Sequence, residues 1–366
     1  MEEIKFPCEA CGAGLQYAPG TTVLKCAYCG HENPIPQGDQ ARIEELDYRA
    51  ALQKLSSDQP VIESAAVKCS NCAAEFTFDP RVTAEDCPFC GTPLVLDETH
   101  KSVVFKPQSL LPFTLDDKQA RERFAVWLNG LWFAPNKVKH YARQKSGLTG
   151  MYVPYWTYDC ATISAYTGQR GEHYYETQSF TAYEDGKPVV YTQQVRHTRW
   201  YPATGTVFRD FDDVLVLAST SLPQAQAERL EPWDLASLVP YSEEYLSGFR
   251  AEAYHVDVEQ GFSQAQAVMD RVVRADVRND IGGDEQRIHS VQTRHERITF
   301  KHVLLPVYLA AYRYKDRVYR FVVNARTGEV QGERPYSAVK IALFVLAVAI
   351  LIALAVMWAG GQTHQG

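Results

Sequence analysis

Four pairs of cysteines near the N-terminus constrain this chain more than any other feature of its sequence. The pairs are Cys8 and Cys11, Cys26 and Cys29, Cys69 and Cys72, and Cys87 and Cys90. They form two quartets with the same spacing, C-x₂-C-x₁₄-C-x₂-C. Two residues between cysteines let a tight turn place both sulfurs on one ion, and two such turns complete a tetrahedral four-sulfur site. The sequence therefore predicts two small zinc ribbons with these eight cysteines as ligands.

The expected role of these metal ions is structural. All four ligands of each site come from the protein, so no position is left for a reactive water. A module of this size cannot fold on apolar burial alone, and structural zinc supplies roughly 10–16 kcal/mol in comparable peptides. Gly12, Gly30 and Gly91 follow second cysteines and are suited to positive φ. Iron in a rubredoxin-like centre is the alternative, because a four-sulfur site also accepts it.

The charge distribution argues against nucleic-acid binding by these modules. The chain carries a net charge of −7, but residues 1–100 hold 7 Lys and Arg against 16 Asp and Glu, a net of −9. Duplex binding needs Lys and Arg to replace counterions on phosphates. The acidic N-terminal part is therefore expected to contact proteins, and a nucleic-acid-binding role is the rival interpretation.

The rest of the chain divides into a large body and a membrane anchor. We expect a zinc ribbon at 1–37, a helical spacer at 38–60, a second ribbon at 61–98, a body at 99–336, a transmembrane helix at 337–360 and a short tail at 361–366. The body is predicted to be an α+β fold rich in antiparallel strands, with helices after Thr114 and from 263 to 277. An aromatic strand follows each predicted helix, at Val153-Pro154-Tyr155 and at Leu305-Pro306-Val307, so a duplicated unit is one reading.

No catalytic motif is present in the body. The sequence lacks a phosphate-binding P-loop, the H-E-x-x-H and G-x-S-x-G motifs, and a dinucleotide-binding glycine pattern. Cys160 is expected to be a buried thiol. Three carboxylates, those of Asp210, Asp212 and Asp213, could together hold Mg²⁺, but they are expected to be solvated or to cap a helix. The histidines at 289, 295 and 302 lack ligand spacing, and Gly168, Gly171 and Gly205 are expected in hairpin turns. We therefore predict no enzyme activity, no bound small-molecule substrate and no catalytic residues.

A run of nineteen apolar residues, 341–359, predicts a single membrane-spanning helix. At 1.5 Å per residue it is about 28 Å long, close to the hydrocarbon core of a bilayer. Tyr336 and Trp358 stand where interfacial aromatic residues belong. Arg334 and Lys340 precede the run and no Lys or Arg follows it, which indicates a cytoplasmic body and a tail across the inner membrane. No secretory leader is expected at the acidic N-terminus.

Together these features resemble a family of bacterial membrane proteins with a zinc ribbon likened to that of transcription factor IIB. Its members are often labelled primosomal protein N′ (replication factor Y), superfamily II helicase-like. The resemblance rests on the cysteine pairs, Leu46-Asp47-Tyr48, Tyr152-Val153-Pro154-Tyr155-Trp156, the segment 211–216, Leu304-Leu305-Pro306-Val307-Tyr308 and the segment 327–335. It implies an association with phage-shock and SPFH-type scaffold proteins. Helicase or ATPase activity is not expected, because the motor motifs are missing.

The sequence as a whole therefore predicts a membrane-anchored adaptor. Its acidic zinc-ribbon head would dock cytoplasmic proteins, including phage-shock or SPFH-type envelope-stress scaffolds, and its C-terminal helix would hold them at the inner membrane. The alternative is a nucleic-acid-binding zinc-ribbon factor tethered to the membrane.

Overall fold

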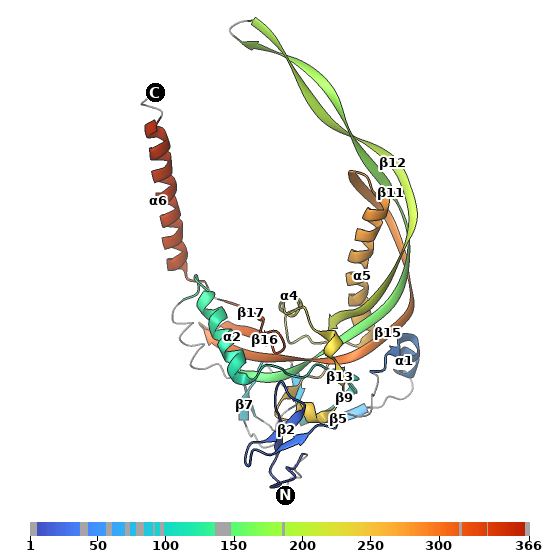
Figure 1. Ribbon diagram of the computed structural model, residues 1–366, viewed down its shortest axis with the longest axis vertical. Coiled ribbons are helices and arrows are strands. Elements are labelled where there is room, and N and C mark those ends of the chain that lie inside the picture. The colour runs from blue at the N-terminus through green and yellow to red at the C-terminus, as the bar shows by residue number, and fades with distance from the viewer. Residues whose placement is uncertain are drawn as a thin grey trace.

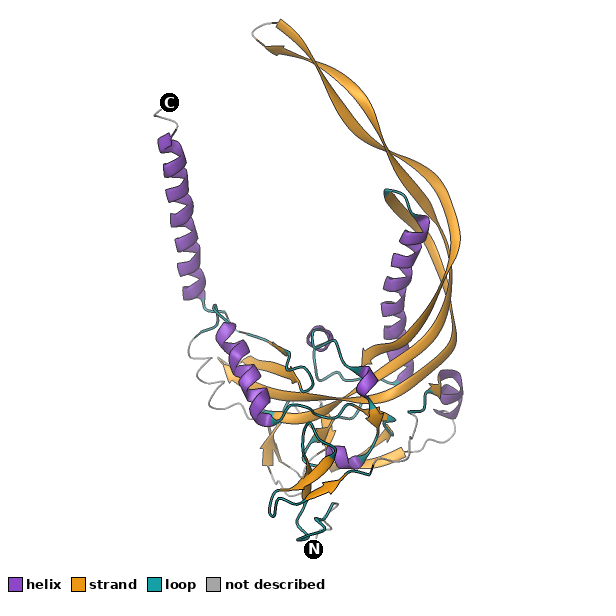
Figure 2. Ribbon diagram, viewed as in Figure 1, coloured by secondary structure: helices purple, strands orange, loops and turns teal. Residues whose placement is uncertain are grey.

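The computed structural model describes residues 6–36, 43–55, 61–69, 74–77, 84–90, 92–95, 99–135, 148–184, 187–314, 317–334 and 336–362. The body is built on one large sheet, mostly antiparallel, with a few helices around it (Figures 1 and 2). Its nine strands are β4 (Leu46–Asp47), β10 (Ser109–Leu110), β11 (Thr149–Glu184), β12 (Lys187–Leu217), β13 (Val239–Pro240), β14 (Arg250–Ala251), β15 (Glu285–Tyr314), β16 (Arg317–Asn324) and β17 (Val330–Gly332). The α+β prediction, rich in antiparallel strands, is confirmed at this level.

Three strands of unusual length form the centre of the sheet. β11 has 36 residues, β12 has 31 and β15 has 30, whereas strands in globular proteins rarely exceed about ten. β12 lies at the edge, β11 pairs with it, and β15 pairs with the other side of β11. The two predicted aromatic strands turn out to be partners, since Val153 pairs with Leu305 and Pro154 with Leu304.

The prediction of hairpin-turn glycines was wrong. Gly168 and Gly171 lie within β11, and Gly205 lies within β12. The β11–β12 pairing is continuous at all three, whereas the pairing of β11 with β15 shifts register between Thr167 and Gly168. A Cβ on Gly168 would lie 2.3 Å from the carbonyl oxygen of Arg287, and one on Gly205 would lie 2.7 Å from the hydroxyl of Tyr166. These glycines allow close packing within the long, curved strands (Figure 1) and do not mark their ends.

Helices lie around this sheet, and all but the last of them pack near the body (Figure 1). They are α1 (Tyr48–Leu55), α2 (Asp117–Gly130), α4 (Gln224–Glu228), α5 (Val258–Ile281) and α6 (Ala338–Gln362), with 3₁₀ turns at Leu235–Ser237 and Glu243–Leu246. The predicted spacer helix is shorter than expected, because residues 46 and 47 join the sheet instead, and Asp39 lies outside the described residues. The helix predicted after Thr114 is α2, which begins with a capping box: the Asp116 carboxylate accepts from the backbone N–H of Gln119, whose side chain accepts from the N–H of Asp116.

α5 supports the long strands over only part of their length. Its buried residues recur every three or four positions and include Phe262, Met269 and Val277, which face β11, β12 and β15. Near its C-terminal end the Tyr166 hydroxyl donates to Asp280 (2.6 Å), and Arg209 pairs with Asp276. β15 begins at Glu285, opposite Gly171. Beyond that point β11 and β12 continue as a two-stranded ribbon of thirteen pairs, from Glu172 with Arg199 to Glu184 with Lys187, which we call the arm (Figure 1).

Smaller sheets surround the N-terminal cysteines. One contains β1 (Leu15–Tyr17), β2 (Val23–Cys26) and β3 (Glu32–Pro34), and another contains β6 (Glu75–Thr77), β5 (Val61–Lys68) and β9 (Thr99–Phe105). β7 (Ala84–Asp86) pairs with β8 (Pro93–Val95). β1 and β2 therefore form an antiparallel pair between the two cysteine pairs of the first quartet, and β6 lies between those of the second.

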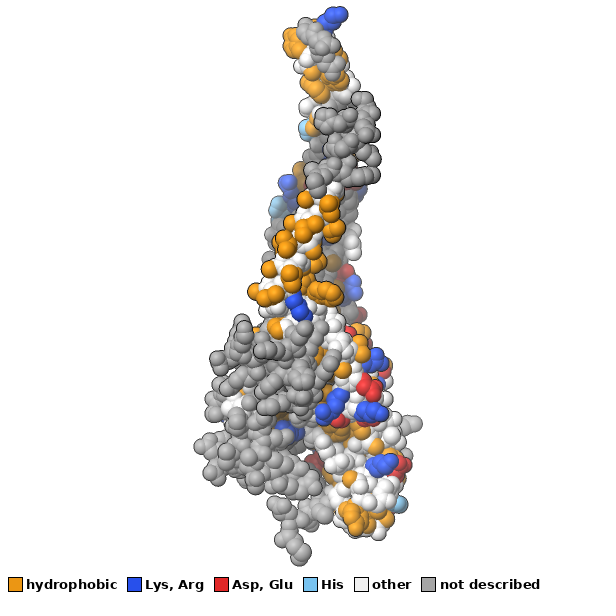
Figure 3. All heavy atoms as spheres, turned by 90° about the vertical axis from the view of Figure 1, so that its left-hand side faces the viewer, with side chains coloured by type: hydrophobic (Ala, Val, Ile, Leu, Met, Phe, Trp, Pro, Cys, Tyr) orange, Lys and Arg blue, Asp and Glu red, His pale blue; other side chains and the backbone are white. Residues whose placement is uncertain are grey.

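α6 is the apolar helix that the sequence predicts. It covers residues 338–362, and none of the segment Ala338–Ala355 is buried inside the protein. Within the described part of the chain it alone is long and apolar enough to cross a membrane. Hydrophobic side chains cover its surface, with Lys and Arg side chains at its base (Figure 3). At that base the Lys340 ammonium donates to the carbonyl oxygens of Trp132 (3.2 Å) and Ala134 (2.8 Å).

Candidate metal centre

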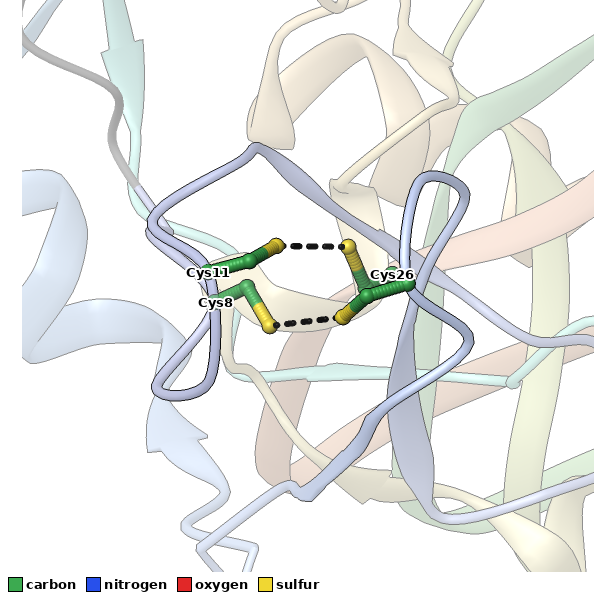
Figure 4. A group of neighbouring side chains, drawn as sticks. Cys8, Cys11 and Cys26 are labelled. Atoms are coloured by element: carbon green, nitrogen blue, oxygen red, sulfur yellow. Dashed lines mark hydrogen bonds between the residues drawn. The ribbon is translucent and has the colours of Figure 1, made fainter.

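The four cysteines of the first quartet converge, as the spacing predicts. Cys8, Cys11, Cys26 and Cys29 place their sulfurs within 4.8 Å of one another. The sulfur of Cys8 lies 3.7 Å from that of Cys29, and the sulfur of Cys11 lies 3.6 Å from that of Cys26. The first cysteine turn thus faces the second across a small gap (Figure 4). A tetrahedral site with metal–sulfur bonds of about 2.3 Å separates its sulfurs by roughly 3.8 Å. The observed spacing therefore fits one tetrahedral metal ion.

The second quartet converges in the same way over its described residues. Cys69, Cys87 and Cys90 lie within 4.8 Å of one another, with 3.6 Å between the sulfurs of Cys69 and Cys90. Cys72, the predicted fourth ligand, lies outside the described residues. The two groups, which we call the first and second cysteine clusters, are both compatible with metal binding.

All four cysteine turns are built by the same backbone hydrogen bond. The N–H of the first cysteine of each pair donates to the carbonyl five residues later: Cys8 to Ala13, Cys26 to His31, Cys69 to Ala74 and Cys87 to Thr92, at 2.7–2.9 Å. In the first cluster Gly12 and Gly30 have φ of 73° and 76°, as their position after the second cysteine predicts. In the first cluster this repeated turn brings the two sulfurs of each pair to one point before any ion is considered.

The thiols of the first cluster are arranged for a cation. Backbone N–H groups of Cys29 and Tyr28 donate toward the sulfur of Cys26 and lower its pKa to about 6, although burial opposes them. For Cys11, the N–H of Ala13 lowers the pKa, but neighbouring thiols and burial raise it to about 12. Four sulfurs this close cannot all be deprotonated unless a positive ion balances them. The donor set, four sulfurs in a tetrahedron, suits zinc or iron.

The first cluster is fixed to the body. Leu15, Tyr17, Leu24 and Ile35 share a buried core with Leu110, Phe113 and Tyr245. The Tyr17 hydroxyl donates to the carbonyl oxygen of Phe113 (3.2 Å), and the Ser247 hydroxyl donates to that of Leu15 (2.7 Å). The opposite side of the cluster is open, and Tyr28, between Cys26 and Cys29, is 86% exposed.

The second cluster also packs on the sheet. Cys69, Cys87 and Cys90 are buried together with Phe76 and Phe89 against Met151, Val153 and Leu305. The N–H of Ala253 donates to the carbonyl of Glu75 (3.1 Å), and the Arg250 guanidinium lies 5.9 Å from the ring centre of Phe76. Sequence reasoning could not show this docking, because it depends on residues almost 180 positions away.

The body residues singled out in the sequence are buried, packed against aromatic rings or ion-paired. Cys160 is buried, and burial raises the pKa of its thiol. His302 is buried beside Trp156, with ring centres 4.8 Å apart, and His295 lies against Phe262. Asp210 forms an exposed ion pair with Arg297, whereas Asp213 takes part in a buried cluster.

Sequence reasoning missed that buried cluster, which centres on Lys301. Its ammonium lies 2.7 Å from Asp213, 3.2 Å from Glu45 and 3.8 Å from Asp159, and only 8% of its side chain is exposed. The cluster forms at a bulge in β11, where the pairing of β11 with β12 and its pairing with β15 both shift register at Asp159. It ties the segment before α1 to the sheet, because the Thr299 hydroxyl also donates to Glu45 (3.0 Å). No sequence motif predicts the Lys301 cluster.

Replacing Lys301 by methionine is expected to destabilise the folded protein by about 3 kcal/mol at pH 7.5, because three carboxylates then lose their cation. Burial raises the pKa of Asp159 to about 6, although Lys301 lowers it. The folded state therefore binds more protons than the unfolded state between about pH 4 and pH 6, and stability from this group falls as pH rises through 6. The loss should consequently be smaller at pH 5, as measured by urea unfolding in detergent.

The matched control is Arg297→Met, since Arg297 and Asp210 form an ion pair whose side chains are 78% and 83% exposed. Exposed pairs contribute little, so this variant should unfold close to the wild type. Equal losses for Lys301→Met at both pH values would contradict the assignment of Asp159 as the proton acceptor.

Comparison with known proteins gives one relative of similar length. The chain is 26% identical to "Uncharacterized protein YdjG" of Bacillus subtilis (strain 168) over 352 residues, which is 94% of each chain. No protein-family model matches the chain, and no solved structure matches it.

Proposed function

We propose that this protein is a membrane-anchored adaptor whose two cysteine clusters are zinc ribbons and whose first ribbon docks cytoplasmic proteins. The observation that carries the proposal is the placement of the first cluster. Its inner side is fixed to the body, its outer side is open, and it lies at the end of the body opposite α6 (Figure 1). An adaptor needs this arrangement, with a rigid head held away from its anchor.

The charge of the head favours a protein partner over nucleic acid. Glu9, Tyr28 and Glu32 of the first ribbon are exposed, although Glu32 lies 3.7 Å from the Lys25 ammonium, and residues 1–100 have a net charge of −9. A zinc ion bound by four thiolates adds a further −2 at each site. Such a surface repels phosphates and attracts basic groups, while an exposed aromatic ring supplies an anchor of the kind that dominates protein interfaces. The family resemblance suggests phage-shock or SPFH-type scaffolds as these partners.

The proposed membrane crossing requires α6 to change direction relative to the arm. Both rise from the same side of the body (Figure 1). The arm and its base carry exposed Arg170, Arg196 and Arg199, and each charge costs about 2.5–3.5 kcal/mol within a bilayer. We therefore infer that α6 leaves the body away from the arm when it enters lipid. In this proposal the chain changes direction after β17. The contacts of the Lys340 ammonium with the carbonyl oxygens of Trp132 and Ala134 are then replaced by contacts with lipid headgroups.

The adaptor proposal is tested by recruitment of a purified phage-shock or SPFH-type scaffold to vesicles that contain the full chain. Tyr28→Ser should weaken recruitment by about tenfold or more, since truncation of a central aromatic anchor commonly costs 2 kcal/mol or more. Tyr201→Ser is the control, because Tyr201 is also exposed but lies on β12. Salt-sensitive binding of an oligonucleotide by the same vesicles, with no recruitment of scaffold, would instead support the nucleic-acid alternative.

A further inference from the structure

The outer part of the arm differs in composition from the rest of the sheet. Seven pairs join residues 177–183 of β11 to residues 188–194 of β12, from Thr177 with Gln194 to Tyr183 with Pro188. None of these fourteen residues is charged, and none is histidine. We call this section the distal arm. Charged residues return immediately on the body side, with Glu176 on β11 and Arg196 on β12.

Large apolar side chains are exposed on both faces of the distal arm. Phe180 and Tyr191 stack on one face, with ring centres 5.7 Å apart. The alternate face carries Val190 and Tyr183, which are 65% and 76% exposed; neighbouring pairs in a strand point to opposite faces. Hydrophobic side chains are visible near the tip in Figure 3. This concentration of apolar surface far from the core is not needed by the folded body.

The distal arm also has open edges. β12 is the edge strand of the nine-stranded sheet, and β15 stops opposite Gly171, so within the described residues neither side of the distal arm meets a third strand. A lone two-stranded ribbon is marginally stable in water. Natural edge strands are normally protected by charges or proline, and between residues 189 and 195 the edge of β12 has neither. The edge of β12 between residues 189 and 195 therefore lacks the usual barriers to pairing with a further strand.

We propose that this strand comes from a second copy of the same chain, and that two β12 edges pair antiparallel about a two-fold axis at Thr192. This register sets Thr192 opposite itself, Val189 opposite Val195, and Val190 opposite Gln194. Threonine pairs and β-branched pairs of this kind stabilise neighbouring antiparallel strands. The result is a four-stranded sheet made from two arms, with an isologous interface.

Charge selects both the occupant and the register. Two identical edges can pair in any register without facing like charges where they are uncharged, and residues 188–195 meet that condition. Sliding the copies toward their bodies brings Arg196 and Arg199 of each chain against the same residues of the other, and like charges directly opposite are destabilising. The overlap is therefore confined to the distal arm, which leaves α5 and both cysteine clusters outside the interface.

The test is a charge exchange at Thr192, made in the full chain in detergent and read as mass by light scattering. The wild type should be a dimer. Thr192→Glu and Thr192→Lys should each weaken self-association at least tenfold, because like charges then face each other across the axis. An equimolar mixture of the two variants should form the dimer again, which a merely misfolded arm cannot do.

Thr204→Glu serves as the matched control, since Thr204 is exposed on the same strand but lies on the body side of the arm. It should dimerise like the wild type. A wild-type chain that stays monomeric at every concentration overturns the proposal. A dimer that survives in both Thr192 variants overturns it as well, because the interface then lies elsewhere.

Discussion

Replacing Cys26 by serine is expected to lower the metal content of the purified protein from two zinc ions to one and to release the N-terminal module from the body. Cys26 is 1% exposed and supplies one of the four converging sulfurs. Metal binding contributes roughly 10–16 kcal/mol to modules of this kind, far more than the short sheet β1-β2-β3 gains on its own. The expected effect on this part of the chain is therefore loss of folding.

Loss of the metal from the first cluster should also destabilise the body, because the N-terminal module and the body share a hydrophobic core. Tyr17 packs edge-to-face on Tyr245, with ring centres 5.0 Å apart, and donates a hydrogen bond to Phe113. Elemental analysis measures the metal, and limited proteolysis between residues 6 and 36 measures the release. Cys160→Ser is the control, since that thiol is buried outside both clusters and should leave two ions bound. Unchanged zinc in Cys26→Ser, or a preparation that holds mainly iron, would refute the zinc-ribbon prediction.

Ending the chain before Ile341 is expected to convert an integral membrane protein into a soluble one. The truncation removes the apolar part of α6, none of which is buried in the segment Ala338–Ala355. About twenty apolar residues in a helix suffice to span a bilayer, and the body offers α6 little beyond the contacts at its base. After a carbonate wash the full chain should stay in the membrane pellet, whereas the truncated chain should appear in the supernatant.

A second truncation, after Gly360, provides the control. It removes only the tail and leaves the helix long enough to span, so this form should stay in the pellet. Flotation on a density gradient distinguishes membrane association from aggregation, because only lipid-bound protein rises. A truncated chain that floats as well as the full chain would show that α6 is not the anchor.

Local features of the fold could be predicted from the sequence because each depends on neighbouring residues. The cysteine turns need only their own glycines and a hydrogen bond across five residues. α2 begins at its capping aspartate, and α6 follows from an unbroken apolar run. Spacing alone likewise identified the cysteines that converge in the first cluster and the three described cysteines of the second.

The features that sequence reasoning missed depend on contacts between distant residues. Glycines and polar residues suggested several short strands where β11 and β12 run without interruption, since the glycines make room for Ile281, Arg287 and Tyr166. The Lys301 cluster joins carboxylates from three separate segments of the chain. The docking of both cysteine clusters on the sheet depends on Phe113, Tyr245 and Arg250, none of which carries a recognisable motif.

The order in which the three long strands are made has a consequence for synthesis. β11 and β12 are consecutive and can pair as soon as both have left the ribosome, but β15 begins at residue 285, 68 residues after β12 ends at 217. At about 5–20 residues per second this takes roughly 3–14 seconds. Throughout that time the body-side part of β11 presents the edge that β15 will occupy. Between residues 149 and 171 that edge carries charges only at Asp159 and Arg170 and one proline, Pro154, so few of the residues that normally protect an edge strand keep nascent chains from pairing along it during this time.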